Sequence, residues 1–439
     1  MLSIDGLRAD LVDDPTLELP ALRGLIARGA RAHRMVAVFP TVTWPCHTSI
    51  VTGVSPARHG VLGNLVFDRA SGRPLEHYGD RTSAPVQAPT LWDRLHARGE
   101  CTASVCWPKT RGVAAVADNI PEFYEQELFE EYASRPLWTE LARNGLPVHR
   151  YGPWSKHHPL GPMQDWLTLE AARHVLAVRP PRLLLLHFLT LDSFQHDHGV
   201  DSAEARWALL HMDALLGRLL DTLAGLGRPE TTTLMVFGDH GFVNIERTHH
   251  LNQLLREKGL LELDGRGEIA QRRAWAAGNG GAAHVYVLDG APRTTAERLA
   301  ERFRALPGVE VLGPERFAEV GLPAPTPGSM QGDLVLAADD GVFFTGHPSP
   351  EAAAGSRPSR CSTWPPPRRS CSTWTCRARR AARSSRRSTR RPGSGPRRAS
   401  GADSTELRRT AHASPRGGLA SGGRPRGWRP GRRAATAAG

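Results

Sequence analysis

Residues 39–53 read Phe-Pro-Thr-Val-Thr-Trp-Pro-Cys-His-Thr-Ser-Ile-Val-Thr-Gly, and the other candidate functional residues can be placed around this stretch. We interpret it as the end of a strand over Met35–Phe39, a turn bounded by prolines, and the start of a helix that carries His47. Thr43 lies in the turn, so its hydroxyl points out of the sheet beside the free backbone N–H groups of the helix N-terminus. Because such N–H groups bind phosphate, Thr43 is a candidate nucleophile for phosphoryl transfer.

A threonine hydroxyl is a weak nucleophile at neutral pH unless a base or a metal ion lowers its pKa, so metal ligands are expected elsewhere in the chain. Candidate ligands stand at or just beyond the ends of apolar segments: Asp5, Asp192, His196, Asp239 and His240. The carboxyl ends of parallel strands meet at one edge of a sheet, so these side chains can share a site. Oxygen and nitrogen ligands beside a hydroxyl fit two zinc ions best, with other divalent metals as the alternative.

The formal charge of +12 suggests a nucleic-acid-binding protein, but the charge is unevenly distributed. Residues 351–439 hold 22 arginines, no lysine and three acidic residues, a local charge of +19, so the first 350 residues carry about −7. We therefore expect no nucleic-acid binding, except nonspecifically through the tail. The six cysteines include no CxxC pair, which excludes a disulfide framework and a cysteine zinc site.

No apolar run reaches the length of a transmembrane helix, and no signal peptide precedes Asp5. Only four residues precede Asp5, which is short for a strand that delivers a key carboxylate. A start site further upstream would explain this, so both a cytoplasmic and an exported location stay open. The oligomeric state also stays open.

Strand and helix patterns alternate through residues 1–243, which predicts a catalytic α/β core with a doubly wound, mostly parallel sheet and helices on both faces. The apolar run at 183–189 is typical of a strand buried on both faces. Residues 244–332 have a less regular pattern, which we interpret as a small α/β insertion over the metal edge. Residues 333–350 are predicted to return to the core.

Several polar and aromatic residues have two interpretations. Asn64 lies in a turn-rich loop after the nucleophile helix, and its amide can donate to a phosphoryl oxygen, although an Asn beside Gly often serves only the turn. Structural histidines are favoured over ligands at three positions with apolar neighbours: His249, His250 and His284. Core packing is favoured over a base or lipid pocket for three aromatic residues: Trp107, Phe123 and Trp154.

The amino-acid composition changes beyond about residue 350. Residues 351–439 contain no Val, Ile, Phe, Tyr or Met, so they cannot bury a core, and we predict a disordered tail rich in Arg, Pro and Ser. One interpretation is a basic arm that binds polyanions. The other is a shifted reading frame, which we favour because these residue types have GC-rich codons and Trp and Cys are unusual in basic tails.

Together these motifs resemble the alkaline phosphatase superfamily and, within it, the type I phosphodiesterase/nucleotide pyrophosphatase family. The resemblance covers roughly the first 345 residues and lies in Ser3–Arg8, Phe39–Pro45, Thr52-Gly53, His59–Val61, Gly63-Asn64, Asp192 with His196, and Gly238–Gly241. It implies that one zinc is held by Asp5, Thr43, Asp239 and His240, and a second by Asp192 and His196. It also implies attack by Thr43 on phosphorus, hydrolysis of the phosphothreonine by activated water, and contact of Asn64 with the phosphoryl oxygens.

Thr41 is a competing nucleophile by residue type, but the attacking residue of the family matches Thr43. The family also supplies a third histidine to the second zinc from a late His-Gly pair. No His-Gly pair follows Gly241 here, and His347 is followed by Pro348. We therefore expect the chain as written to fold poorly or to be weakly active.

The expected function is hydrolysis of phosphodiester or pyrophosphate bonds in small, nucleotide-like substrates. A phosphomonoesterase or phosphonate hydrolase of the same superfamily is the close alternative. The lack of an obvious Arg or Lys beside Thr43 favours diesters, because a terminal phosphate carries more charge. From a different class, the chain could be an inactive remnant that binds polyanions through its tail.

Overall fold

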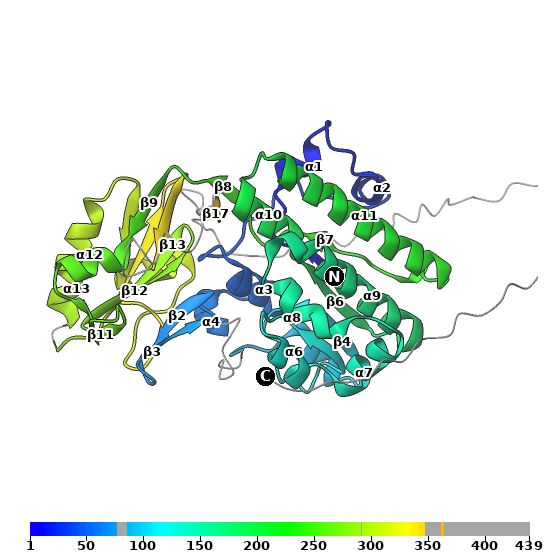
Figure 1. The fold of residues 1–439 in the computed structure, drawn as a ribbon, viewed down its shortest axis with the longest axis horizontal. Helices are drawn as coiled ribbons and strands as arrows, with labels where there is room; N and C mark the ends of the chain where they lie inside the picture. Colours follow the sequence, from blue (N-terminus) through cyan, green and yellow to red (C-terminus); the bar gives the residue numbers. More distant parts are fainter. Residues whose placement is uncertain (77–85, 291, 347–360, 364–439) are drawn as a thin grey trace, which may run out of the picture. The chain divides into compact units, whose positions relative to one another are not determined.

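The structure is a computed structural model that describes residues 1–76, 86–290, 292–346 and 361–363 (Figure 1). No helix among these residues is both long enough and apolar enough to cross a membrane. The prediction of a disordered tail concerns residues 351–439, of which only Cys361–Thr363 are described. They form strand β17, which pairs antiparallel with β8 (Phe242–Asn244).

The first sheet is parallel throughout and has the strand order β5-β4-β6-β1-β7. Its strands are β1 (Leu2–Ile4), β4 (Thr102–Trp107), β5 (Asp118–Pro121), β6 (Leu183–Phe188) and β7 (Val236–Phe237). Helices lie between β1 and β4, between β5 and β6 and between β6 and β7, whereas β4 joins β5 through residues 108–117 without a helix. The predicted mostly parallel α/β sheet is therefore confirmed.

Alternate residues of β6 pack on opposite faces of the sheet, because successive side chains of a strand point to opposite sides. Leu186 belongs to the core formed with α9 (Gly161–Val178) and α11 (Ala203–Gly225). Leu185 packs on the other side, with residues of α3 (Thr43–Thr52) and α5 (Leu91–His96). Helices thus cover both faces, as the doubly wound prediction requires (Figure 1).

The remaining helices around this sheet are short. They are α1 (Ala9–Asp13), α2 (Pro20–Arg28), α4 (Pro56–His59), α6 (Gln126–Tyr132), α7 (Arg135–Arg143), α8 (Tyr151–Ser155) and α10 (Thr190–His198). Helix α2 packs against α11, where the buried Asp213 carboxylate accepts hydrogen bonds from the backbone N–H groups of Ala21 and Leu22. These two hydrogen bonds cap the start of α2, whose first N–H groups have no partner within the helix.

A second sheet is antiparallel and has the order β12-β13-β15-β14. Its strands are β12 (Ala274–Asn279), β13 (Ala282–Val287), β14 (Val309–Leu312) and β15 (Leu334–Ala338), with helices α12 (Leu251–Glu257) and α13 (Pro292–Arg304). Strand β16 (Val342–Thr345) pairs with β9 (Arg247–His250), β10 (Leu261–Leu263) with β11 (Ile269–Arg272), and β2 (Leu65–Asp68) with β3 (Arg73–Glu76).

The predicted return of residues 333–350 to the parallel sheet does not occur in the described part of that segment. Strand β15 instead lies inside the second sheet, between β13 and β14. The reason is burial on both sides: Val335 and Leu336 are fully buried and belong to two different hydrophobic clusters. A buried apolar strand fits the centre of either sheet, so its composition does not reveal its partner.

Two apolar segments form less strand than their composition suggests. Met35–Phe39 forms no strand, and Met35 and Val36 are exposed. The apolar segment at 231–237 contributes only β7, because Met235 is exposed and residues 229–231 form a 3-10 helix. Apolar composition predicted strands here, but without a neighbouring strand no ladder forms.

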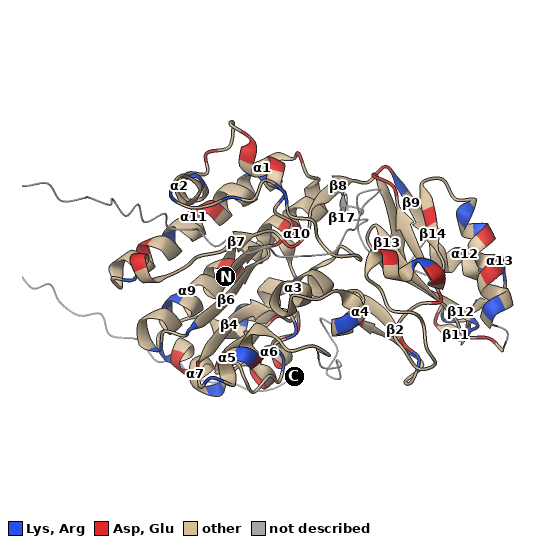
Figure 2. Cartoon of the chain, turned by 180° about the vertical axis from the view of Figure 1, so that it is seen from behind, with Lys and Arg blue, Asp and Glu red and all other residues tan. Residues whose placement is uncertain are grey.

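Acidic and basic residues are interspersed on the surface helices, as Figure 2 shows for α13. Within this helix the Arg293 Nε atom lies 3.3 Å from Glu297 Oε1, one helical turn away. Such exposed pairs contribute little to stability, but they leave α13 without a face of one charge.

Candidate active site

Four predicted site residues meet at the carboxyl-terminal edge of the parallel sheet. Asp5 follows β1, and Asp239 and His240 follow the neighbouring strand β7. Thr43 is the first residue of α3. All four side chains are buried. Because β1 and β7 are parallel neighbours, their carboxyl ends bring together residues that are more than 200 positions apart in the chain.

The ligand atoms of this group are spaced as around one tetrahedral ion. His240 Nε2 lies 3.1 Å from Asp5 Oδ1, 3.3 Å from Thr43 Oγ1 and 3.5 Å from Asp239 Oδ2. Ligands that bind zinc tetrahedrally at 2.0–2.2 Å lie about 3.3–3.6 Å from one another. The three distances from His240 Nε2 lie near this range, and Asp5, Asp239 and His240 form a group suited to a metal ion.

The two carboxylates direct oxygens without hydrogen-bond donors into this group. Asp5 Oδ1 and Asp239 Oδ2 are buried, and neither accepts a well-aligned hydrogen bond from the described residues. The other oxygen of Asp239 accepts a hydrogen bond from the backbone N–H of Gly6 at 3.2 Å, so Oδ2 is the one that faces His240. Both oxygens lie close to the His240 ring, and a divalent cation in place of its Nε2 proton would contact both of them.

The charges of the group also favour a cation. Burial raises the pKa of Asp239 to about 6, and the nearby Asp5 carboxylate adds to the shift. The same two causes raise the pKa of Asp192. Burial disfavours the charged form of His240, but the Asp239 and Asp5 carboxylates outweigh it and raise the pKa of His240 to about 10. The buried carboxyl groups of Asp5 and Asp239 and the half-buried one of Asp192 thus lie around one imidazolium, and a divalent cation would relieve their repulsion.

Asp192 and His196 form a pair next to this group. They lie one turn apart on α10, with His196 Nε2 at 3.5 Å from Asp192 Oδ1, and Asp192 Oδ1 is 4.0 Å from His240 Nε2. Burial lowers the pKa of His196 to about 4, so its ring is neutral, the form that binds metals. In the described part of the chain no third His, Cys, Asp or Glu completes a group with this pair. His347 lies outside the described residues.

The structure separates the two candidate threonines. Thr43 Oγ1 faces His240, whereas Thr41 Oγ1 donates a hydrogen bond to the carbonyl of Val38 at 2.9 Å. Thr41 is therefore engaged with the backbone of its own loop. Thr43 has the position expected of the nucleophile.

Asn64 lies beside the start of α3. Its side-chain oxygen accepts a hydrogen bond from the backbone N–H of Trp44 at 3.0 Å. Its own backbone N–H donates to Asn279 Oδ1 at 2.8 Å. Gly63 leaves room for this contact, since a Cβ there would lie 2.8 Å from Asn279 Oδ1.

The sequence of the chain matches the model of a known family. A family model described as type I phosphodiesterase / nucleotide pyrophosphatase matches residues 1–364. The chain belongs to this family. Ectonucleotide pyrophosphatase/phosphodiesterase family member 1 of Mus musculus is 25% identical over 244 residues, which are 55% of this chain and 23% of that protein. An uncharacterised pyrophosphatase/phosphodiesterase of Schizosaccharomyces pombe is 25% identical over 281 residues, 63% of this chain and 50% of that protein. The chain therefore spans at most about half the length of these relatives.

Solved structures share the fold. Murine ectonucleotide pyrophosphatase/phosphodiesterase 5 has a TM-score of 0.55 and 19% sequence identity, covering 82% of each chain. Phosphonoacetate hydrolase from Sinorhizobium meliloti 1021 has a TM-score of 0.57 and 22% identity, covering 80% of this chain and 82% of the other. The predicted alkaline-phosphatase-like fold is thus confirmed.

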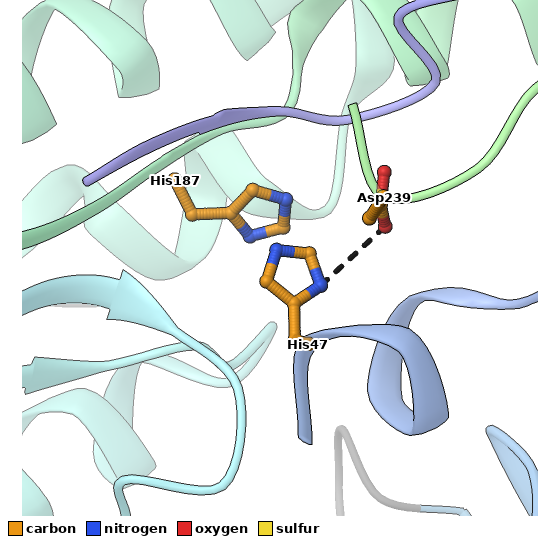
Figure 3. Close-up of side chains that lie close together, drawn as sticks. All are labelled: His47, His187 and Asp239. Atoms are coloured by element: carbon orange, nitrogen blue, oxygen red, sulfur yellow. Dashed lines mark ion pairs between the residues drawn. The ribbon is translucent and has the colours of Figure 1, made fainter. Parts of the chain in front are cut away.

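Two buried histidines beside the site were not predicted as site residues. Figure 3 shows His47 from α3 and His187 from β6 beside Asp239, with the ring centroids of the two histidines 4.3 Å apart. His47 Nδ1 donates a hydrogen bond to the Thr43 carbonyl at 2.8 Å and lies 3.4 Å from Asp239 Oδ2. His187 Nε2 lies 3.2 Å from Asp5 Oδ2. The one signal in the sequence is a histidine that interrupts the apolar run of β6.

A buried cation lies beside a residue of the first turn of α3. Lys109 follows β4, is buried, and places its Nζ 5.8 Å from the centroid of the Trp44 ring, next to Thr43. It has a φ of +61°, a conformation that non-glycine residues rarely adopt and that is common at functional sites. Lys109 thus places a cation beside the side chain of Trp44, the residue that follows Thr43.

The other histidines and aromatic residues have structural surroundings. His284 Nε2 lies 2.8 Å from the Leu62 carbonyl, and His249 Nε2 lies 3.0 Å from the Pro307 carbonyl. His250 lies at the end of β9, outside both potential metal groups of the described residues. The three aromatic residues that were weighed between core packing and a base or lipid pocket are buried: Trp107, Phe123 and Trp154. This burial agrees with the core-packing interpretation.

Proposed function

We propose that this protein is a metal-dependent hydrolase of phosphodiester or pyrophosphate bonds, acting on nucleotide-like substrates through a phosphothreonine intermediate at a two-zinc site. The observation that supports this most directly is the position of Thr43 Oγ1, 3.3 Å from His240 Nε2. A hydroxyl at this point is both part of a tetrahedral ligand group and the first side chain of a helix. Family membership agrees with the proposal.

The residues fall into two ligand sets. Asp5, Thr43, Asp239 and His240 would hold the first zinc, and Asp192 with His196 would hold the second. When bound, zinc supplies Lewis-acid stabilisation of phosphoryl oxygens and lowers the pKa of a hydroxyl or water. The neutral ring of His196 and the carboxylate oxygens of Asp5 and Asp239 that face His240 are suited to this role.

Thr43 carries the covalent step. Its Oγ1 forms a bond to phosphorus while the bond from phosphorus to the leaving-group oxygen breaks, and the hydroxyl proton passes to solvent. Water then cleaves the phosphothreonine, which restores the hydroxyl and releases the phosphorylated product. The Asn64 amide and the first backbone N–H groups of α3 stabilise the charge on the phosphoryl oxygens.

The test is hydrolysis of bis(nitrophenyl) phosphate and nitrophenyl phosphate by purified protein loaded with zinc. We expect a higher kcat/KM for the diester, loss of activity with a chelator, and recovery when zinc is added back. Hydrolysis that a chelator does not affect, or none with either ester, would contradict the proposal. A preference for the monoester would replace it with the second candidate below.

The second candidate is a phosphomonoesterase or phosphonate hydrolase, and Lys109 favours it. A buried ammonium group beside Trp44 can neutralise the extra charge of a terminal phosphate or phosphonate. The Lys109→Met variant separates the two candidates. If Lys109 contacts a terminal phosphate, this variant loses monoester hydrolysis selectively, whereas a diesterase loses both activities equally or neither.

A further inference from the structure

His187 and Glu122 are buried titratable residues that the proposed chemistry does not use. His187 lies in β6, and Glu122 directly follows β5; both side chains are almost completely inaccessible. His187 Nε2 lies 3.2 Å from Asp5 Oδ2. On the other side of the ring, Nδ1 lies 3.2 Å from the Cys106 carbonyl oxygen and 3.7 Å from Glu122 Oε2.

The backbone of β4 is deformed at the point where it meets this ring. The pairing register of β4 with β5 shifts between Val105 and Trp107, and Cys106 has a φ of +60°. Bulges of this kind redirect groups near functional sites, and a non-glycine residue in this conformation carries a strain cost. The result is a Cys106 carbonyl that accepts a hydrogen bond from the His187 ring.

The two oxygens of Asp5 therefore have different neighbours. Oδ1 lies 3.1 Å from His240 Nε2, whereas Oδ2 lies 3.2 Å from His187 Nε2. A ligand carboxylate whose second oxygen is also contacted, as Asp5 Oδ2 is by His187, cannot rotate freely about its side-chain bond. Partners of this kind commonly tune metal affinity by fixing the orientation of a ligand.

We propose that His187 is a positioning residue of the metal site: its Nε2 contacts Asp5 Oδ2, so that Oδ1 is directed at the metal. The Cys106 carbonyl and the Glu122 carboxyl group orient the ring from the opposite side. This inference rests on the proposed first zinc. It adds a requirement for His187 and Glu122 that the ligand set alone does not contain.

A direct ligand role for His187 fits the contacts less well. His47, His187 and Asp239 do form a group of potential ligands. However, the His47 nitrogen close to Asp239 is Nδ1, which already donates to the Thr43 carbonyl at 2.8 Å. A metal ion at that nitrogen would have to break this hydrogen bond at the start of α3.

The test measures zinc affinity by chelator competition and zinc content at saturation, in the full chain and three variants. His187→Phe fills the volume without a donor, and His187→Gln keeps an amide donor. The matched control is His284→Phe, because His284 is also completely buried but hydrogen-bonds to the Leu62 carbonyl in the second sheet. Circular dichroism and thermal unfolding report the fold of each variant.

We expect His187→Phe to lower zinc affinity at least about tenfold, with the same zinc content at saturation, and His187→Gln to recover part of the loss. The control should lose stability without losing zinc affinity. Unchanged affinity in a folded His187→Phe protein would overturn the inference while leaving the proposed function intact. A lower zinc content at saturation would also overturn it, because His187 would then be a ligand.

If His187→Phe does not fold, Glu122→Gln carries the test. It keeps the shape of the side chain but weakens the support of the His187 ring, so a loss of zinc affinity is expected and unchanged affinity contradicts the inference. If the unaltered protein binds no zinc or other divalent metal, the proposed function itself fails. The two failures are thus distinguishable.

Discussion

At the scale of single residues, Thr43 and Thr41 provide a matched pair. Thr43 faces the ligand group, whereas Thr41 donates to the Val38 carbonyl. We expect Thr43→Ala to lower kcat at least about 10³-fold, because it removes the nucleophile. Thr41→Ala should keep most of the activity and lose about 1 kcal/mol of stability with its hydrogen bond. Steady-state kinetics and thermal unfolding of both variants test this, and the reverse order of effects would identify Thr41 as the nucleophile.

The titration of the ligand residues predicts how zinc binding depends on pH. The folded protein without metal holds protons on His240, with a pKa of about 10, and on Asp239, with a pKa of about 6. Zinc must displace the His240 proton to bind Nε2, so its affinity should rise about tenfold per pH unit for each proton released. Calorimetry between about pH 6 and 8, where His240 is mainly protonated, measures this.

Both raised pKa values also affect folding without metal. A raised pKa in the folded state contributes stability that is present below the unfolded value and lost as pH rises through the folded value. For His240 that loss runs from its ordinary pKa of 6.5 to about 10, and for Asp239 from 3.8 to about 6. The stability of the metal-free protein should therefore fall with rising pH. The stabilisation by zinc should increase over the same range. A zinc-induced shift of Tm that does not change with pH would contradict both the expected loss of metal-free stability and the expected gain in stabilisation by zinc.

At the scale of elements, the link between β12 and the Asn64 loop is a specific contact. Asn279 Oδ1 accepts hydrogen bonds from the backbone N–H groups of Asn64 and Leu65, and its amide donates to the Leu65 carbonyl at 2.9 Å. Asn279→Ala should cost about 1–3 kcal/mol of stability and lower kcat, because the loop that carries Asn64 loses its support. Asn279→Asp keeps both acceptor contacts and should retain more activity. Lowered stability with unchanged kcat would show that the loop holds its position without β12.

At the scale of the whole molecule, the tail is predicted to act separately. The compact unit defined by internal contacts ends at Thr373. A chain that ends at Thr373 should unfold at the same temperature as the full chain. If the 22 arginines of residues 351–439 bind polyanions, the full chain should bind DNA with an affinity that falls steeply with salt, and truncation should weaken this binding. Equal DNA binding by both chains would contradict a role for the tail.

The shifted-frame hypothesis is also tested at this scale. Sequencing the encoding DNA across codons 335–365 should reveal whether one base restores an ordinary α/β composition and a late His-Gly pair. A restored pair would supply the third ligand that Asp192 and His196 lack among the described residues. If the frame stands as written, the inactive-remnant interpretation becomes the stronger one, and zinc content near one per chain is expected.

The sequence by itself determined the alternation of strands and helices, the family, and the residues at the carboxyl ends of β1 and β7. It could do so because parallel strands place their ends at one edge, whatever the length of chain between them. Asp5, Asp239 and His240 are thus predictable from local pattern alone. Thr43 is predictable from the turn before α3, although the strand expected before it does not form.

Only the tertiary structure decided the partners of β15 and the roles of His187, Lys109 and Asn279. A buried apolar strand such as β15 fits either sheet, so its place depends on which edge is available. His187 looks like a core residue in sequence, and only the pairing of β6 with β1 brings its ring to Asp5, across a separation of 182 positions. Local pattern specifies which face a side chain points to, whereas contacts between distant segments depend on how the strands pair and the helices pack.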